Sequence, residues 1–292
     1  FKAFFRPVKA GETPGYPRFK GYGRYDSFTF KQSGFKLDGE RLIRSRIGSI
    51  KIKLHRPICA EMKTLTIQGD AVGNCYACFS CACEPKPLPP TAKVVGVDLG
   101  LTTFAYFSHG DRIDRQRWMG RDAIEIARLQ RKKEQFPKGR PERGKVVRAW
   151  PHAYRGAANR RPNYAHQASR KRVNAYQFMA FEKLDIQDMQ VKGNQTIARG
   201  IADVAWGQFV QFTTYKAEEA GRGVAHVNPR GTNQACSGCG QVVPKTMRDR
   251  VHDCPDCGLR LNRDHHAALN ILARGLVSIN TDSSVVVQAH VL

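Results

Sequence analysis

The chain has 292 residues, 41% of them hydrophobic, a length and composition that exclude a fully disordered protein and suit two or three compact units. It carries 48 Lys and Arg against 25 Asp and Glu, and a formal net charge of +23 strains a compact fold unless a polyanion such as nucleic acid neutralises it. A solubilising or membrane-surface role is the alternative, but the sequence has no basic amphipathic anchor and no run of about 18 apolar residues, so we expect no membrane span.

Residues 1–90 are rich in glycine and aromatic side chains and contain short alternating runs, such as residues 27–30 and 50–54. Alternation of this kind between Gly and Pro turns is typical of short β-strands. We therefore predict a small all-β unit, a barrel, over this region. It ends in a proline cluster that predicts a linker, formed by Pro85, Pro87, Pro89 and Pro90.

Two predicted apolar strands stop at acidic residues. Residues 94–97 form a continuous apolar run that stops at Asp98, and residues 176–181 regain strand character and stop at Glu182. Another strand is predicted at residues 104–107. Continuous apolar runs are typical of central strands covered on both faces, so we predict an α/β sheet here.

Residues 112–172 hold 19 Lys or Arg against five acidic residues, with few apolar side chains. This composition predicts two basic helices around a Pro and Gly turn near residues 137–144. A solvated charged hairpin is the alternative, but the excess of positive charge favours a surface that follows phosphates. The candidate nucleic-acid contacts are Arg131, Lys132, Lys133, Arg160, Arg161, Arg170, Lys171 and Arg172.

The C-terminal part alternates helix and strand patterns. Residues 196–220 have apolar side chains at helical spacing, so we predict one helix there, ended by residues 221–223. A short strand is predicted at residues 224–227. A last helix is predicted at residues 264–276, and residues 277–292 carry no clear site and are predicted to be a tail.

Two cysteine pairs, each enclosing two residues, lie between this strand and the last helix. Their members are Cys236, Cys239, Cys254 and Cys257. Each pair forms a knuckle that places two thiolates on one metal, and two knuckles complete the tetrahedral set that Zn²⁺ prefers. Gly240 and Gly258 follow the pairs, where the knuckle turn favours a positive φ. We predict a structural zinc that folds a nucleic-acid-facing module, rather than a catalytic zinc.

A second group of cysteines lies in the all-β unit, at Cys75, Cys78, Cys81 and Cys83. Successive side chains of a strand point to opposite faces, so Cys78 lies opposite the other three. Since a flat strand does not wrap four ligands around one ion, we interpret them as small apolar side chains of a barrel strand. Nothing in the sequence indicates secretion, so thiols are expected rather than disulfides.

Three acidic residues, Asp98, Glu182 and Asp264, come from distant segments. Ligands gather where the strands of an α/β sheet end, so these carboxylates could converge there and hold Mg²⁺ through hard oxygens. Two such ions, about 4 Å apart, activate a water and stabilise the leaving oxygen in phosphodiester cleavage. The alternative is that each is a surface residue or helix cap, a role for which Asp264 is well placed.

Taken in the order in which they occur along the chain, these motifs resemble those of the TnpB family. TnpB proteins are transposon-encoded RNA-guided nucleases and relatives of the miniature type V CRISPR effectors. Residues 95–100 resemble the first RuvC motif of that family, and residues 181–184 resemble the second. Residues 228–232, the paired cysteines and residues 264–271 resemble the ribbon and the third motif. Residues 24–57 resemble its wedge domain.

The resemblance implies an α/β RuvC (RNase H-like) nuclease domain with an inserted zinc ribbon, preceded by a β-barrel wedge domain of the oligonucleotide-binding type. The implied segments are the wedge at 1–90, the RuvC-like domain with the basic hairpin at 91–230, the ribbon at 231–260, the last RuvC helix at 261–276 and the tail at 277–292. The family's N-terminal strand and helical recognition domain are not evident, so we expect an upstream truncation or a reduced form.

The resemblance also implies the chemistry and the partners. Asp98, Glu182 and Asp264 become a catalytic triad with two Mg²⁺, beside the structural zinc. The implied partners are a guide RNA and double-stranded target DNA, whose pairing reads sequence while the protein reads shape. We expect a monomer in the cytoplasm, associated with the nucleoid. The alternatives are a nuclease-inactive RNA-guided repressor, or a guide-independent RuvC-type nuclease or transposase; the intact acidic set favours cleavage.

Overall fold

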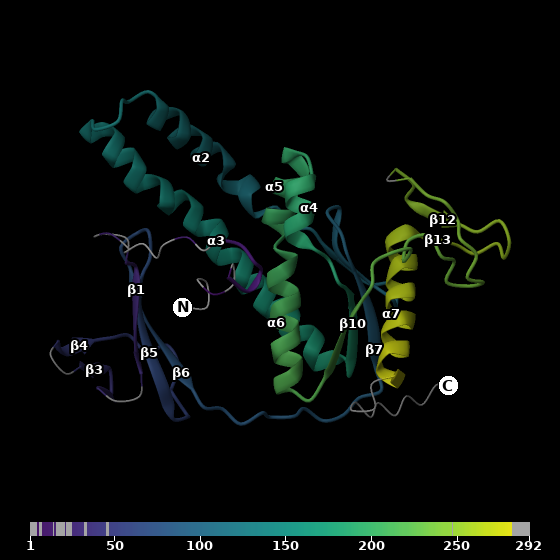
Figure 1. Cartoon of the computed structure of the whole chain (residues 1–292), viewed down its shortest axis with the longest axis horizontal. Helices are drawn as coiled ribbons and strands as arrows, with labels where there is room; N and C mark the ends of the chain where they lie inside the picture. Colours follow the sequence, from purple (N-terminus) through teal and green to yellow (C-terminus); the bar gives the residue numbers. More distant parts are fainter. Residues whose placement is uncertain are drawn as a thin grey trace. The chain divides into compact units, whose positions relative to one another are not determined.

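The computed structural model describes residues 5, 8–13, 15, 21, 25–31, 34–44, 47–246 and 248–281. The chain divides into two compact units, Phe1–Glu84 and Pro85–Leu292 (Figure 1). Within the described residues, no helix is both long and apolar enough to cross a membrane.

The first unit is built from strands, as its alternating runs predict. One antiparallel sheet has the order β1-β5-β6, with β1 (Ser27–Lys31), β5 (Met62–Gly69) and β6 (Cys75–Cys81). The other has the order β2-β3-β4, with β2 (Phe35–Asp38), β3 (Arg41–Arg44) and β4 (Gly48–Lys51). Leu65 and Leu42 are the buried residues of the two sheets. In the part of this unit that the structure describes, no ladder closes the strands into a barrel, so the barrel stays a prediction.

The four cysteines of this unit lie on or just after β6. Cys75, Cys78 and Cys83 are exposed and Cys81 is half-buried. Since most of them face solvent, they are less buried than the small apolar side chains of a barrel strand that we expected.

The second unit is centred on a five-stranded sheet of order β11-β10-β7-β8-β9. Its strands are β7 (Val94–Leu99), β8 (Thr103–Phe107), β9 (Arg112–Asp114), β10 (Phe178–Glu182) and β11 (Gly223–Val227). β7, β10 and β11 run parallel, whereas β7, β8 and β9 form an antiparallel meander. The central strands β7 and β10 are buried on both faces, which explains why their apolar runs do not alternate.

Helices cover both faces of this sheet (Figure 1). On one face, Val95, Val97 and Phe181 pack with residues of α3 (Pro141–Ala175) and α6 (Trp206–Glu219). On the other face, Phe178 and Ala180 pack with Ile271 of α7 (Arg263–Thr281). The helix α7 is longer than the predicted 264–276, and residues 282–292 of the predicted tail lie outside the described residues.

The prediction of a single helix over residues 196–220 is wrong. The structure has α5 (Gln195–Val204) and α6, separated by Ala205 in the left-handed region at φ 57°. Ile201 and Phe209 still face the same core on either side of the break. A break of one residue that keeps the same face of both helices buried does not change the spacing of the apolar residues. The sequence therefore does not reveal it. The short helix α4 (Ile186–Lys192) precedes α5.

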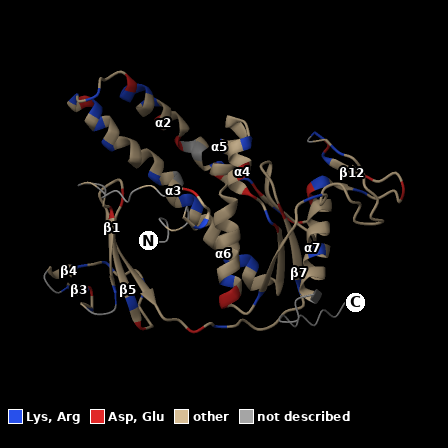
Figure 2. Ribbon diagram, viewed as in Figure 1, with Lys and Arg blue, Asp and Glu red and all other residues tan. Residues whose placement is uncertain are grey.

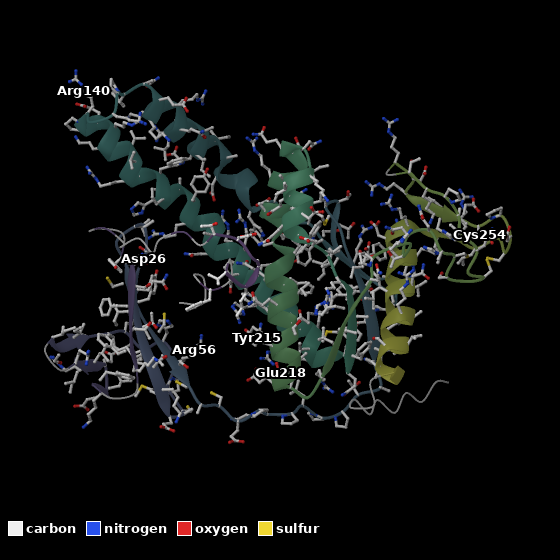
Figure 3. All side chains as sticks on the ribbon, viewed as in Figure 1. Asp26, Arg56, Arg140, Tyr215, Glu218 and Cys254 are labelled. Atoms are coloured by element: carbon white, nitrogen blue, oxygen red, sulfur yellow. The ribbon has the colours of Figure 1, made fainter. Side chains whose placement is uncertain are left out.

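The basic region forms a helical hairpin, as predicted. Its helices are α2 (Trp118–Glu134) and α3, joined by a turn at which Arg140 lies (Figure 3). Lys and Arg positions, blue on the ribbon, are distributed along both helices (Figure 2). Residues 112–114, which we assigned to the hairpin, are instead the edge strand β9.

Candidate functional site

The three predicted acidic residues meet at one edge of the five-stranded sheet. Asp98 lies near the end of β7, and Glu182 is the last residue of the adjacent parallel strand β10. Parallel neighbours present their carboxyl ends at the same edge of a sheet, which brings these two side chains together. Asp264 lies in the first turn of α7, which packs on the same strands.

The electrostatics of the cluster follow from its burial and from the three negative charges gathered there. Burial raises the pKa of Asp98 well above its ordinary value, and the negative charges of Glu182 and Asp264 raise it further. The positive charge of Arg263 opposes this increase. Burial also raises the pKa of Glu182, against the lowering effects of a Thr232 hydrogen bond and of Arg274. Desolvated carboxylates that repel one another are the donor set that a hard divalent cation stabilises.

The spacing of the cluster is wider than that of a single-ion cage. Among the described residues, the groups whose potential ligand atoms all lie within 4.8 Å of one another are the paired cysteines and a Cys236, His252 and His266 group. The three carboxylates are not such a group.

Two residues that we did not assign to the site act on Glu182, one by a hydrogen bond and one by its charge. The Thr232 hydroxyl donates a hydrogen bond to Glu182 Oε1. Arg274, on α7, lowers the pKa of the same carboxyl through its positive charge. Thr232 lies at the end of a motif that we related to the ribbon, but nothing in that motif indicates a contact with Glu182.

The four paired cysteines converge as predicted. They flank the two-stranded sheet of β12 (Val251–Asp253) and β13 (Arg260–Asn262), where Cys254 is labelled in Figure 3. The Sγ atoms of Cys236 and Cys257 are 3.6 Å apart, as are those of Cys239 and Cys254. Tetrahedral zinc with Zn–S bonds of about 2.3 Å places its sulfurs about 3.8 Å apart, so the set fits one zinc ion.

The local backbone is that of two metal knuckles. Gly240 has φ 81° and its N–H donates to the Cys236 carbonyl at 2.8 Å, while Gly258 has φ 71° and donates to the Cys254 carbonyl at 3.0 Å. Burial tends to raise the pKa of Cys236, but hydrogen bonds from the N–H groups of Cys239 and Gly238, and from His252 and Cys257, outweigh it and lower that pKa to about 5. A thiolate at neutral pH is the form that binds zinc.

Replacing Cys254 with Ser should reduce bound zinc well below one ion per chain, because a hydroxyl is a poor replacement for one of four thiolates. Loss of the metal should then expose residues 236–258 to proteases, since the knuckles lose the bond that holds them together. Elemental analysis and limited proteolysis with mass spectrometry measure both effects. The exposed Cys78 on β6 provides the matched control, since Cys78→Ser should leave the zinc content unchanged. A protease-resistant ribbon without zinc would contradict a structural role for the metal.

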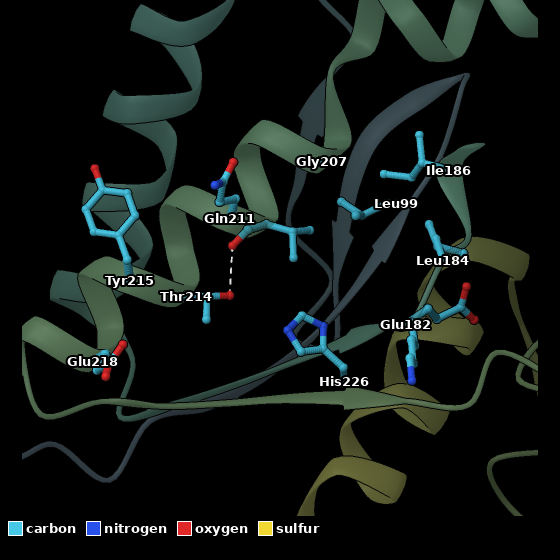
Figure 4. A pocket seen from close by; sticks show the side chains of 12 residues that line it. Leu99, Glu182, Leu184, Ile186, Gly207, Gln211, Thr214, Tyr215, Glu218 and His226 are labelled. Atoms are coloured by element: carbon cyan, nitrogen blue, oxygen red, sulfur yellow. Dashed lines mark hydrogen bonds between the residues drawn. The ribbon is translucent and has the colours of Figure 1, made fainter. Parts of the chain in front are cut away.

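A cavity of about 410 Å³ opens beside Glu182 (Figure 4). It lies between the ends of β7, β10 and β11 and the helix α6, with apolar walls from Leu99, Leu184 and Ile186. His226 lines it as well, and burial lowers its pKa, as does the positive charge of Lys183. The exposed, flat imidazole of His226, at the edge of apolar walls and near the carboxylates, offers a surface on which a ring can stack.

The predicted basic contacts divide into two groups. Several are engaged within the protein: Arg160 with Asp122 (2.6 Å), Arg161 with Asp203 (3.5 Å), Arg170 with Glu219 (3.2 Å), Arg172 over the Phe107 ring (4.1 Å) and Lys133 over the Trp150 ring (4.2 Å). The remaining three, Arg131, Lys132 and Lys171, are exposed. The sequence could not separate the two groups, because the partners lie far away along the chain.

Comparison with known proteins assigns the family. Residues 78–192 match a family model described as a probable transposase, OrfB of IS605, and residues 206–271 match the Cas12f1-like TNB domain. A protein of Streptomyces pristinaespiralis named "Putative RNA-guided DNA endonuclease" is 29% identical over 90% of this chain. The TnpB-like protein L770 of Acanthamoeba polyphaga mimivirus is 24% identical over 77% of it. The chain belongs to the TnpB family.

The match spans only part of these TnpB relatives, 66% of the Streptomyces protein and 46% of the mimivirus protein. The CRISPR-associated endodeoxyribonuclease Cas12f1 of Sulfoacidibacillus thermotolerans is 26% identical over 65% of this chain. Among solved structures, a CRISPR-Cas12f ternary complex is similar with a TM-score of 0.47 and 15% identity, covering 73% of this chain and 46% of that one.

Proposed function

We propose that this TnpB-family protein is an RNA-guided, transposon-associated DNA endonuclease, with a RuvC (RNase H-like) active site at Asp98, Glu182 and Asp264. The observation that carries this proposal is the meeting of three acids from distant segments in one desolvated cluster, in which Asp98 senses both others. Two Mg²⁺ ions bound there would activate the attacking water and stabilise the leaving oxygen. The oxygen-only donor set suits Mg²⁺, as the sulfur-only set suits zinc.

The protein's own residues hold the carboxylates in place before substrate arrives. Asp98 is fixed by a central strand and Asp264 by the first turn of a helix packed on that strand. Thr232 orients Glu182 through its hydrogen bond. Rigid supporting elements of this kind reduce the reorganisation needed in the transition state. The cavity beside Glu182 lies where the base of a nucleotide next to the cleaved phosphate could be received.

We further propose that the first unit includes the wedge barrel and that a guide RNA and the target DNA run along the basic hairpin. The names of the relatives support the RNA-guided activity, and the charge of +23 supports a nucleic-acid partner. Within the hairpin, the exposed Arg131, Lys132 and Lys171 are the contacts we favour. The engaged arginines would act by keeping α3 and its surroundings rigid.

Binding should weaken steeply with salt, because each phosphate contact releases a counterion. Replacing Arg131, Lys132 and Lys171 together with Ala should reduce the slope of log affinity against log salt by about 3, or about 0.9 per lost contact. Fluorescence anisotropy with labelled duplex DNA, between about 50 and 200 mM salt, measures this slope.

Arg161→Ala is the matched control for this measurement. Arg161 pairs with the buried Asp203, so its loss should lower the melting temperature while leaving the salt slope nearly unchanged. An unchanged slope in the triple variant would remove the exposed residues from the binding surface.

The test of the function begins with the RNA that co-purifies with the protein from its native locus. A discrete RNA from a transposon end would establish guidance and would supply the guide for a Mg²⁺-dependent cleavage assay. Only heterogeneous RNA, with cleavage still dependent on Asp98, would instead support a guide-independent nuclease. Binding of the guided target without cleavage would support an RNA-guided repressor.

A further inference from the structure

The chain from the end of β11 into the first cysteine knuckle runs past the carboxylate cluster. We call residues 228–237 the connecting segment. We propose that the connecting segment, through Thr232, positions Glu182 for metal binding, and that zinc in the ribbon fixes this segment in place. The inference rests on the carboxylate site proposed above and adds Thr232 as a positioning residue and the zinc as a control on that site.

One face of α7 holds the connecting segment. His266, Asn270 and Arg274 are spaced four residues apart, so they lie on the same side of the helix. Arg274 donates hydrogen bonds to the backbone carbonyls of Asn228 and Arg230, each at 2.8 Å. This guanidinium thus fixes the start of the segment and also places a positive charge near Glu182.

The other two residues of this face hold the middle and the end of the segment. Asn270 donates to the carbonyls of Thr232 and Ala235, each at 2.7 Å. The Nε2 atom of His266 accepts a hydrogen bond from the Ser237 N–H at 3.0 Å. Side chains of α7 thus bind five backbone groups of the connecting segment. This many bonds fix the conformation of the segment as well as its distance from the helix.

Thr232 links this fixed segment to Glu182. It is fully buried, and its hydroxyl lies within reach of both Glu182 Oε1 and the Pro229 carbonyl, the latter at 2.9 Å. A hydroxyl has one hydrogen to donate, and an ionised carboxylate is the stronger acceptor. The hydroxyl therefore donates to Glu182 and fixes that oxygen, and the other carboxylate oxygen would remain available to a metal.

The zinc end of the segment is equally constrained. Ser237 lies inside the first knuckle, between Cys236 and Cys239, and its partner His266 is fully buried. His266 stacks on the buried His252 of β12, with ring centroids 3.6 Å apart and planes within 10°. If the knuckle opens on zinc loss, the Ser237 N–H leaves His266 and the end of the segment is released. Zinc and Glu182 are thereby connected through one short stretch of backbone.

The test measures binding of Mn²⁺, a paramagnetic substitute for Mg²⁺, to the zinc-loaded full chain without nucleic acid. Thr232→Val keeps the shape of the side chain and removes the hydroxyl, so Mn²⁺ affinity should fall about 10- to 100-fold, the usual effect of losing a partner of a metal ligand. Thr232→Ser restores the hydroxyl and should bind Mn²⁺ close to the parent. Electron paramagnetic resonance counts the free ion, and elemental analysis verifies that zinc is retained.

A second pair of variants covers the case in which Thr232→Val does not fold. His266→Leu removes the acceptor for Ser237, whereas the Gln side chain of His266→Gln can still provide one. With zinc bound, the Leu variant should lose Mn²⁺ affinity and the Gln variant should retain most of it. Zinc-stripped parent protein should resemble the Leu variant.

The outcomes separate this inference from the function on which it rests. Normal Mn²⁺ affinity in Thr232→Val, together with its loss in Asp98→Asn, would overturn the role of Thr232 and leave the carboxylate site intact. Parent protein that binds no Mn²⁺, or Asp98→Asn that binds it fully, would overturn the carboxylate site itself. The inference would be supported if Thr232→Val and His266→Leu bind Mn²⁺ more weakly than the parent while Thr232→Ser and His266→Gln bind it nearly as well.

Discussion

Replacing Asp98 with Asn should reduce DNA cleavage by about 10³-fold or more, since the variant loses a carboxylate of the proposed metal site. The same change should stabilise the metal-free protein by about 1 to 2 kcal/mol, because an isosteric amide removes a buried charge that repels Glu182 and Asp264. Cleavage assays and thermal unfolding in a chelator measure the two effects. A substitution that lowers activity while it raises stability is expected at a functional site and not at a structural ion pair.

The pH dependence of the metal-free protein provides an independent check. The pKa of Asp98 is higher in the folded state than in the unfolded state, so its contribution to stability is fully present below the unfolded value of about 4. This contribution is lost as pH rises through the raised pKa. Asp98→Asn should flatten that part of the stability profile, and Mg²⁺ should flatten it in the parent protein. If the parent protein and Asp98→Asn had the same dependence of stability on pH, the three carboxylates would not form a shared, desolvated cluster.

Replacing Gly96 with Ala should destabilise the second unit by about 3 kcal/mol or more, or prevent its folding. A Cβ atom at Gly96 would lie 2.1 Å from the Ala268 carbonyl oxygen and 2.6 Å from the Leu272 backbone N of α7. Both are backbone atoms of a helix, so no side-chain rotation relieves the clash. The helix must move away from β7, and Asp264 moves with it. Chemical denaturation of the full chain measures the loss.

Gly120→Ala, on α2, is the matched control for this substitution. Its added Cβ meets only Arg117 Cβ, at an ordinary contact distance of 3.7 Å. Alanine is favoured over glycine within a helix by up to about 1 kcal/mol, so this variant should be as stable as the parent or slightly more stable. Equal stability of Gly96→Ala and the parent would show that α7 does not pack on β7 as closely as the structure has it.

The sequence was informative where the signal is local. Apolar runs predict β7 and β10, because strands covered on both faces need apolar side chains at consecutive positions. Cysteine spacing predicts the knuckles and the positive φ of Gly240 and Gly258, since metal geometry dictates both. The meeting of the three acids could be expected from strand ends and from the family's motifs, and in the structure Glu182 and Asp264 lie near enough to Asp98 to raise its pKa.

Features that depend on distant partners could not be predicted. The turn at Ala205 preserves the buried face of both helices, so apolar spacing gives no sign of it. Arg161 and Lys132 have equal charge in the sequence, and only the fold shows that the first pairs with Asp203 while the second faces solvent. The role of Thr232 depends on a residue 50 positions away along the chain.

The position of α7 in the sequence has a consequence for how the protein is made. Asp98 is synthesised early, but the strand that carries Glu182 follows the long α2–α3 hairpin, and Asp264 comes only after the cysteine pairs. The core on one face of the sheet needs Ile271 of α7, so that face stays incomplete on the ribosome until the chain has been translated through Arg263–Thr281. If the proposed chemistry is correct, a nascent or prematurely terminated chain has no assembled site. The proposed nuclease site would then form only after α7 has folded onto the sheet.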